Sequence, residues 1–262
     1  MKRLLATAVA LLALLVPSSA LAQGPDEYPW AKRLKIAKQF AASRAGKVSI
    51  GIVDEDQRFH GYRANRQYNS ASTVKVMLMV AYLRHGKQNH QPLTAGDKAL
   101  LEPMIKRSDN STATRIRNIV GNEGLARLAH KAGMTKFQTN VVWGRTQITA
   151  RDQANWMFRI ERFIPKRHRE YAMNLLTKVI PAQSWGIPPS KPDGYSIHFK
   201  GGWAPSGDPG WTVNQVAQLD PRGAGGKGRF SLAILTRGSP DRKYGIATIR
   251  GVAKKLLKRF PG

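Results

Sequence analysis

The sequence Ser72-Thr73-Val74-Lys75-Val76-Met77-Leu78-Met79-Val80-Ala81-Tyr82-Leu83 is apolar at every position after Lys75. A helix at a protein surface keeps one polar side, whereas a helix that is apolar all round is buried. Residues 72–85 are therefore predicted to form a helix in the middle of a domain. Ser72 and Lys75 stand three positions apart at its start, which would place both side chains on one face.

This Ser-x-x-Lys spacing suits a nucleophilic serine. A serine hydroxyl is a weak nucleophile until a neighbour takes its proton, and a lysine can do so only when burial or nearby positive charge lowers its pKa. The apolar residues after Lys75 would supply the burial. The spacing also arises by chance in a chain rich in serine and lysine, so it needs support from other motifs.

Segments on both sides of this helix predict an α/β (α+β) fold. Helical patterns cover residues 30–40, 94–107, 112–120, 124–132, 151–163, 167–180 and 244–260, and strand patterns cover residues 47–54, 58–62, 196–200, 211–219 and 230–236. The strands most economically form one antiparallel sheet of about five strands, flanked by the terminal helices. The predicted α/β lobe comprises residues 23–66 and 184–262, and the helical lobe residues 67–183, with a cleft between them.

Two further motifs follow in order along the chain. Ser108-Asp109-Asn110 follows a predicted helix, and Lys200-Gly201-Gly202 ends a predicted strand. With Ser72 and Lys75 they resemble the S-x-x-K, S-D-N and K-T/S-G motifs of the serine β-lactamase and penicillin-binding protein superfamily. The resemblance is closest to class A β-lactamases and extends from the hairpin before Ser72 to the C-terminal helix. It implies the β-lactamase/transpeptidase-like fold, although Lys-Gly-Gly departs from the third motif.

The resemblance implies catalytic roles for four residues. Ser72 would be acylated, Lys75 would accept its proton, and Ser108 would relay a proton to the departing nitrogen. Lys200 would supply positive potential for a substrate carboxylate and help to keep Lys75 uncharged.

The resemblance also implies a substrate-binding set. Asn110 would hold the substrate amide, and the backbone N–H groups of Ser72 and Trp203 would form the oxyanion hole. Gly201 and Gly202 would let the strand edge approach the ligand closely. No cofactor and no metal is expected. The enzyme would be a monomer that acts on a β-lactam or a D-alanyl peptide.

The segment expected to form the omega loop departs from the class A pattern. Class A enzymes carry a glutamate there, which activates the water that hydrolyses the acyl-enzyme. Residues 134–149 contain no carboxylate, and their polar residues Gln138, Asn140 and Gln147 cannot act as bases. Three outcomes fit this departure: slow β-lactam hydrolysis, a long-lived acyl adduct as in a D-alanyl-D-alanine carboxypeptidase or another penicillin-binding protein, and hydrolysis of another ester or amide whose acyl-enzyme breaks down by another route. A non-catalytic cell-wall-binding protein stays a further alternative.

Two other enzyme classes are disfavoured by the motifs. A Ser-His-Asp hydrolase of the α/β type would carry a G-x-S-x-G elbow, and the chain has none. A zinc enzyme would need histidines at ligand spacing, and His85 and His90 are the nearest pair among scattered histidines.

The N-terminus and the charge predict an exported, cationic protein. Residues 1–22 read as a cleavable signal peptide, because two basic residues precede a short apolar stretch and the tripeptide Ala20-Leu21-Ala22. A secreted or periplasmic location follows. The formal charge is +27, which favours anionic surroundings such as nucleic acid, acidic lipids or an anionic cell-wall polymer and does not choose among them. The basic residues are scattered without interleaved aromatics, so a specific nucleic-acid site is not expected, and the absence of cysteine excludes disulfides.

Overall fold

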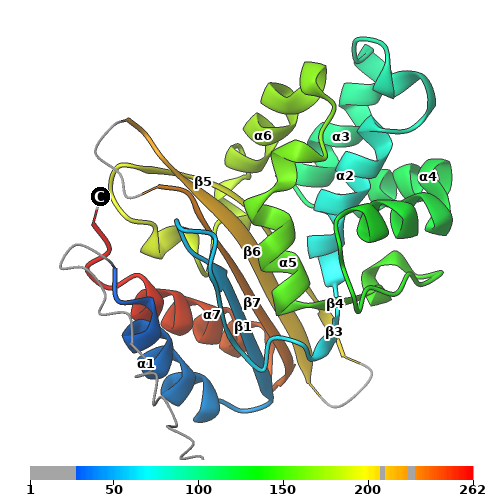
Figure 1. Cartoon of the computed structure of the whole chain (residues 1–262). Helices are drawn as coiled ribbons and strands as arrows, with labels where there is room; N and C mark the ends of the chain where they lie inside the picture. The colour runs from blue at the N-terminus through cyan, green and yellow to red at the C-terminus, as the bar shows by residue number, and fades with distance from the viewer. Residues whose placement is uncertain (1–27, 207–209, 224–227, 262) are drawn as a thin grey trace, which may run out of the picture.

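The computed structural model describes residues 28–206, 210–223 and 228–261, so the predicted signal peptide lies outside the described residues. The helices are α1 (Trp30–Ala42), α2 (Lys75–Leu83), α3 (Ala95–Lys106), α4 (Asn110–Lys131), α5 (Ala150–Phe158), α6 (Arg169–Thr177) and α7 (Arg242–Leu256). The strands are β1 (Lys47–Val53), β2 (Phe59–Tyr62), β3 (Gln67–Asn69), β4 (Gln147–Thr149), β5 (Tyr195–Pro205), β6 (Trp211–Pro221) and β7 (Phe230–Ser239). Figure 1 shows their arrangement.

Five strands form one antiparallel sheet in the order β2-β1-β7-β6-β5, which confirms the predicted fold class. The pairing of β1 with β7, in register Ile50 to Ile234, joins the two ends of the chain. β5 forms one edge of this sheet, so one side of its backbone is left for the cleft.

The predicted end of the third strand pattern at Lys200 was wrong. β5 continues to Pro205, with Gly201 opposite Gln215 and Gly202 opposite Asn214 on β6. Glycine weakens an isolated strand pattern, yet a glycine within a strand is favoured where another backbone approaches closely. The Lys-Gly-Gly motif therefore lies within a strand.

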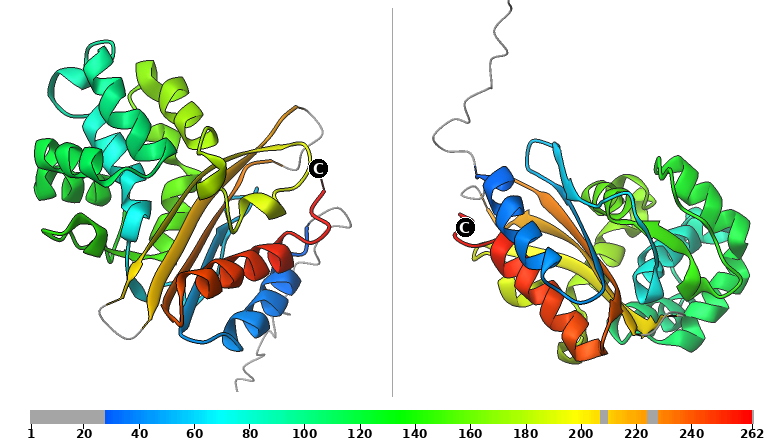
Figure 2. Two further views of the ribbon diagram at one scale, coloured as in Figure 1. Left: turned by 180° about the vertical axis from the view of Figure 1, so that it is seen from behind. Right: turned by 90° about the horizontal axis from the view of Figure 1, so that it is seen from below.

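Helices cover both faces of the sheet. α1 and α7 pack side by side on one face, and α5 covers the other (Figures 1 and 2). Beyond α5, the helices α2, α3, α4 and α6 form a separate group of helices (Figure 1). One apolar core lies between the sheet and the α1–α7 pair, and a second lies among α2 to α6.

The apolar segment after Ser72 forms the centre of the second core. Every residue of α2 is buried, as its composition predicted. The neighbouring α3 begins with the predicted capping box, in which Thr94 and Asp97 satisfy each other's backbone N–H groups. α2 is thus a rigid support for the residues at its N-terminus.

Two local features differ from the sequence patterns. The predicted helices at 112–120 and 124–132 are one element, α4, interrupted at Gly121, whose φ of 70° and ψ of 167° are accessible mainly to glycine. The short strands β3 and β4 form a second, two-stranded sheet that was not predicted, because three residues are too few for a recognisable alternation. Among the described residues, no helix has the length and apolarity that crossing a membrane would require.

Candidate active site

Ser72 stands where the chain turns sharply from β3 into the central helix. It belongs to a 3₁₀ turn, Ala71–Val74, that continues directly into α2. Ala71 has a φ of 47°, an uncommon left-handed conformation for a residue with a side chain. Strain of this kind persists where the surrounding structure enforces it, commonly at functional sites. The half-buried Ser72 is therefore presented at the start of a fixed helix.

The Lys75 side chain is completely buried behind Ser72. Its Nζ donates to the Ser108 carbonyl oxygen at 2.5 Å, to Asn110 Oδ1 at 2.8 Å and to Ser108 Oγ at 3.3 Å. The described residues show no hydrogen bond between Lys75 and Ser72. Burial lowers the pKa of Lys75 to about 7, although the charge of Asp109 acts in the opposite direction. A sizeable fraction of neutral amine at neutral pH follows.

Residues 108–110 form the connection between α3 and α4. Ser108 has a φ of 61°, and Asp109 caps α4 by accepting from the Thr112 backbone N–H at 2.7 Å. The cap fixes the direction in which the chain enters α4. Ser108 and Asn110 can therefore both reach Lys75.

Lys200 reaches the same serine from the sheet. Its Nζ donates to Ser108 Oγ at 2.9 Å and to the Gly201 carbonyl oxygen at 2.9 Å, and the side chain is fully buried. Burial, with a smaller contribution from the charge of Lys75, lowers the pKa of Lys200 well below its ordinary value. Two ammonium groups this close to one hydroxyl repel each other, so the site favours a neutral amine beside Ser108.

The two glycines of the third motif have different neighbours. A Cβ on Gly202 would lie 2.4 Å from the backbone nitrogen of Ser72, so only glycine fits between β5 and the nucleophile's turn. A Cβ on Gly201 would lie 2.5 Å from Cζ2 of Trp185. The indole of Trp185 thus occupies the space that the side chain of a threonine or serine in this motif would need.

Trp203 is held between two side chains at the cleft wall. Its ring centre is 5.8 Å from that of Trp185, and the Arg242 guanidinium carbon lies 3.9 Å from the Trp203 ring centre. Both contacts fix the indole beside Gly202.

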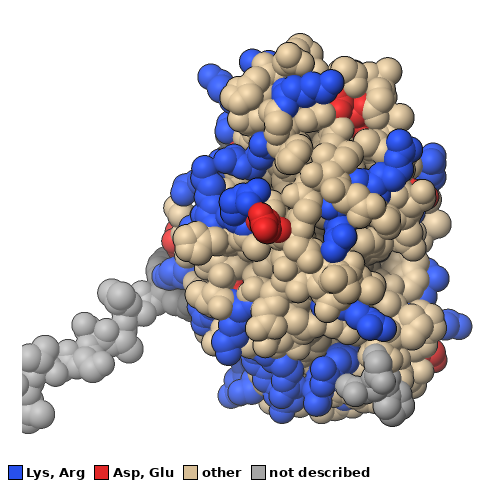
Figure 3. Space-filling model, turned by 90° about the vertical axis from the view of Figure 1, so that its right-hand side faces the viewer, with Lys and Arg blue, Asp and Glu red and all other residues tan. Residues whose placement is uncertain are grey.

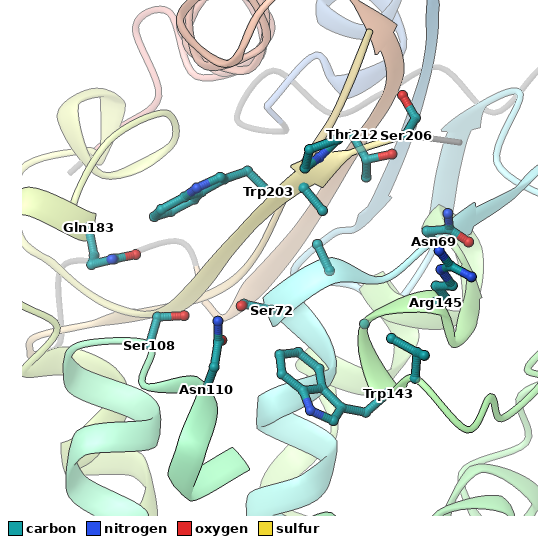
Figure 4. A pocket seen from close by; sticks show the side chains of 15 residues that line it. Asn69, Ser72, Ser108, Asn110, Trp143, Arg145, Gln183, Trp203, Ser206 and Thr212 are labelled. Carbon is teal, nitrogen blue, oxygen red and sulfur yellow. The ribbon is translucent and has the colours of Figure 1, made fainter. Parts of the chain in front are cut away.

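These residues surround a cavity of about 810 Å³. Ser72, Ser108, Asn110 and Trp203 line it, while Lys75 and Lys200 lie behind its surface. Figure 4 shows Ser72, Ser108 and Asn110 close together in the middle of the pocket. The volume matches small-molecule sites, which span about 300–1,000 Å³.

Comparison with known proteins supplies the family. The sequence profile of the Beta-lactamase enzyme family matches residues 86–260. The chain belongs to the Beta-lactamase enzyme family. No curated protein sequence matches it.

Solved β-lactamases share the fold of this family member. A β-lactamase of Xanthomonas campestris superposes with a TM-score of 0.74 at 17% identity, over 87% of this chain and 97% of that chain. A β-lactamase of Sphaerobacter thermophilus gives 0.71 at 20% identity, over 88% and 97%. A class A β-lactamase of Bacteroides cellulosilyticus gives 0.73 at 11% identity, over 88% and 98%. The class A likeness is therefore a likeness of fold, and the chain is a serine β-lactamase-like hydrolase by family.

In this β-lactamase family member, the segment predicted to form the omega loop contacts Lys75 with the indole of Trp143. Lys75 Nζ lies 4.9 Å from the ring centre of Trp143, and Trp143 Nε1 donates to Thr114 Oγ1 at 3.1 Å. No carboxylate of the described residues pairs with Lys75. The nearby Asp152 accepts from the Thr135 and Lys136 backbone N–H groups, which anchors the start of the segment.

Four of the fifteen residues that line the pocket were predicted as site residues, and Trp143 and Gln183 are among those that were not. Trp143 lines the pocket, and the apolar pair Val141-Val142 directly before it, which the structure leaves exposed, was the available sequence signal. Gln183 also lines the pocket, and its Oε1 is buried without a hydrogen-bond partner among the described residues. No sequence pattern marks Gln183.

Proposed function

We propose that the protein is an exported serine hydrolase of class A β-lactamase type that opens a β-lactam, or a similar amide or ester, through an acyl-enzyme on Ser72. One observation carries the proposal. The amines of Lys75 and Lys200 both reach Ser108 Oγ, at 3.3 and 2.9 Å, beside a serine that lines an 810 Å³ pocket. A cell-wall-binding module would have no need for two buried amines with lowered pKa values around one hydroxyl.

The proposed acylation begins with proton transfer from Ser72 Oγ to neutral Lys75. The serine oxygen then bonds to the substrate carbonyl carbon, and the backbone N–H groups of Ser72 and Trp203 stabilise the developing oxyanion. The proton passes through Ser108 to the departing nitrogen as the amide bond breaks. Acylation thus needs no carboxylate.

Substrate binding is assigned to residues that lie directly beside these groups. Asn110 holds the substrate amide, and Gly201 and Gly202 allow β5 to lie against the ligand. A substrate carboxylate near Lys200 raises the pKa of its amine and favours the charged form, because an opposite charge stabilises it. The empty acceptor Gln183 Oε1 offers one further contact to a substrate donor.

Deacylation is proposed to be slow. A water that hydrolyses the ester needs a base, and the omega-loop segment contacts Lys75 with the indole of Trp143, which is not a base. This contact favours a second candidate function, a penicillin-binding protein or D-alanyl-D-alanine carboxypeptidase with a long-lived acyl adduct.

We also propose how the chain is organised. Residues 1–22 would be the signal peptide, residues 23–66 with 184–262 the α/β lobe, and residues 67–183 the helical lobe. The mature protein acts outside the cytoplasm as a monomer without a cofactor.

The decisive experiment is intact-mass spectrometry of the processed protein after incubation with a reporter penicillin or cephalosporin, beside Ser72→Ala. An adduct on the wild type alone is expected, and its decay separates the two candidate functions. If no β-lactam gives either an adduct or turnover, antibiotic acylation is ruled out, and the search moves to other acyl substrates.

A further inference from the structure

A second, basic groove is lined by residues of α1, of α7 and the segment after it, and by Pro189 and Ser190. α1 and α7 lie on the side of the sheet opposite α5 (Figure 2). The volume of the groove is about 610 Å³. The cationic side chains that line it are Arg33, Arg250, Lys254, Lys255 and Lys258. The groove and the Ser72 pocket share no lining residue, so both can be occupied at once.

The groove concentrates positive charge without compensation. No carboxylate lines it, and none of its five cations forms an ion pair with a carboxylate among the described residues. Like charges gathered in a concave surface repel one another and reinforce the local positive potential. An anionic ligand would relieve that repulsion.

The cations come from two helices and form a row. Arg250, Lys254 and Lys258 are exposed and recur every fourth residue, which places them along one side of α7 and its C-terminal end. Arg33 faces them from α1, with its Nε buried and without a hydrogen-bond partner among the described residues. A linear ligand with repeated charges matches a row better than a single small anion does.

Helix stabilisation explains only part of this arrangement. Lysines in the last turn of a helix interact favourably with its dipole, which accounts for Lys254 and Lys255. The effect falls off within one turn, so it does not account for Arg250, and it says nothing of Arg33 on the other helix. The lysine amine of Lys255 is held over the Phe40 ring at 4.7 Å.

The lining also restricts the ligand class. Its uncharged members are Ile36, Pro189, Ser190 and Leu257, with no aromatic ring among them. Proteins that bind single-stranded nucleic acids stack the bases on aromatic side chains. The groove has no such side chain in its lining, so a single-stranded nucleic acid is a poor match for it. On the face shown in Figure 3, by contrast, basic side chains are spread over much of the surface.

We propose that the α1–α7 groove binds a linear phosphate-bearing polymer of the cell envelope. Successive phosphates contact the row of cations, and the Ser72 pocket stays open on the other side of the sheet. The groove would thereby hold the enzyme on an anionic polymer at its place of action. This binding is independent of the acylation chemistry.

The test uses the processed protein and linear inorganic polyphosphate as probe, with affinity measured by calorimetry across a series of salt concentrations. Arg250→Gln/Lys254→Gln/Lys258→Gln is expected to weaken binding at least about tenfold and to lower the salt slope by about two to three, since each lost phosphate contact lowers it by about one. The matched control is Lys87→Gln/Lys131→Gln/Lys136→Gln, which removes the same charge from exposed lysines elsewhere and should change affinity less than about twofold.

Further binding measurements compare polyphosphate with other anionic ligands. Orthophosphate should bind far more weakly than polyphosphate, and thymidine oligonucleotides no more tightly at equal phosphate concentration. Equal losses in the two triple variants would show general charge attraction alone and overturn the proposal. Binding to phosphatidylglycerol vesicles without binding to polyphosphate would overturn it in favour of a lipid surface. If the triple variant fails to fold, Arg250→Gln alone should lower the salt slope by about one, and an unchanged slope would count against the groove.

Discussion

The two sides of the Ser72 pocket carry different chemical groups. On one side, Lys75, Ser108 and Lys200 come from separate segments of the chain and are joined by hydrogen bonds within 3.3 Å, and Ser72 lies at the start of the helix that carries Lys75. On the other side, the segment predicted to form the omega loop offers the indole of Trp143 and no carboxylate. Under the proposed function, the first side would form the ester on Ser72, and the second side offers no base to hydrolyse it. The two proposed half-reactions would therefore depend on separate segments of the chain.

The largest effect is expected from Lys75→Met. Removing the proposed base should slow acylation of Ser72 by about 10²–10⁴-fold, the range of general-base contributions. The same change removes a buried amine, so the protein should keep or gain stability, by on the order of 1 kcal/mol. Single-turnover acylation rates and a thermal denaturation curve measure the two quantities. Near-normal acylation by the variant would show that a group other than Lys75 takes the proton of Ser72. The contrast between the two sides of the pocket would then lose its proposed base.

Gly202→Ala should have the next largest effect. The new Cβ would fall 2.4 Å from the Ser72 backbone nitrogen, so β5 and the nucleophile's turn must separate. A displaced oxyanion-hole donor costs about 10²–10³-fold in rate. The matched control is Gly144→Ala, where the nearest heavy atom is 3.8 Å from the new Cβ. Comparable acylation by Gly202→Ala and the control would show that this close approach has no catalytic role.

The pH dependence tests the charge state of Lys75. Since its pKa is lowered to about 7, the amine is mostly protonated and inactive below that pH and mostly neutral above it. The acylation rate should rise about tenfold between pH 6 and pH 8, where the neutral fraction grows from about a tenth to about nine tenths.

Asp109→Asn provides the control for this assignment. The charge of Asp109 raises the pKa of Lys75, and asparagine preserves the helix cap at α4. The variant should therefore move the rise in rate to lower pH. A rise that stays in place would assign the titration to a different group.

Residues in short local motifs were predictable from the sequence, whereas contacts made by tertiary packing were not. The side chains that meet around Ser108 were predictable because each belongs to a short motif of defined residue types. The buried helix after Ser72 was predictable because all its side chains after Lys75 are apolar. The family and five-stranded sheet followed from these motifs and the strand patterns. Contacts between distant segments were not predictable from local pattern. Trp185 fills the space beside Gly201, and Trp143 lies over Lys75, only because tertiary packing brings those segments together.

The smallest effect is expected from Trp143→Glu, which should speed the hydrolysis of the acyl adduct. A carboxylate on this segment would face Lys75 and the ester on Ser72, where it could activate a water for hydrolysis. Because no surrounding group orients it, we expect about a fivefold faster decay of the acyl adduct, well below the full range of a positioned base. The negative charge should also raise the pKa of Lys75 and slow acylation near pH 7.

Trp143→Gln separates the added base from the removed indole, since both variants lose the contact with Thr114 and open the same space. Faster decay in Trp143→Glu alone would show that the absent carboxylate limits turnover. Equal acceleration in both variants would show that the indole excludes water from the ester, and the contrast between the two sides of the cleft would then be one of solvent access. Unchanged decay in both would place the limit on deacylation outside this segment, because neither a base nor open space at position 143 would have relieved it.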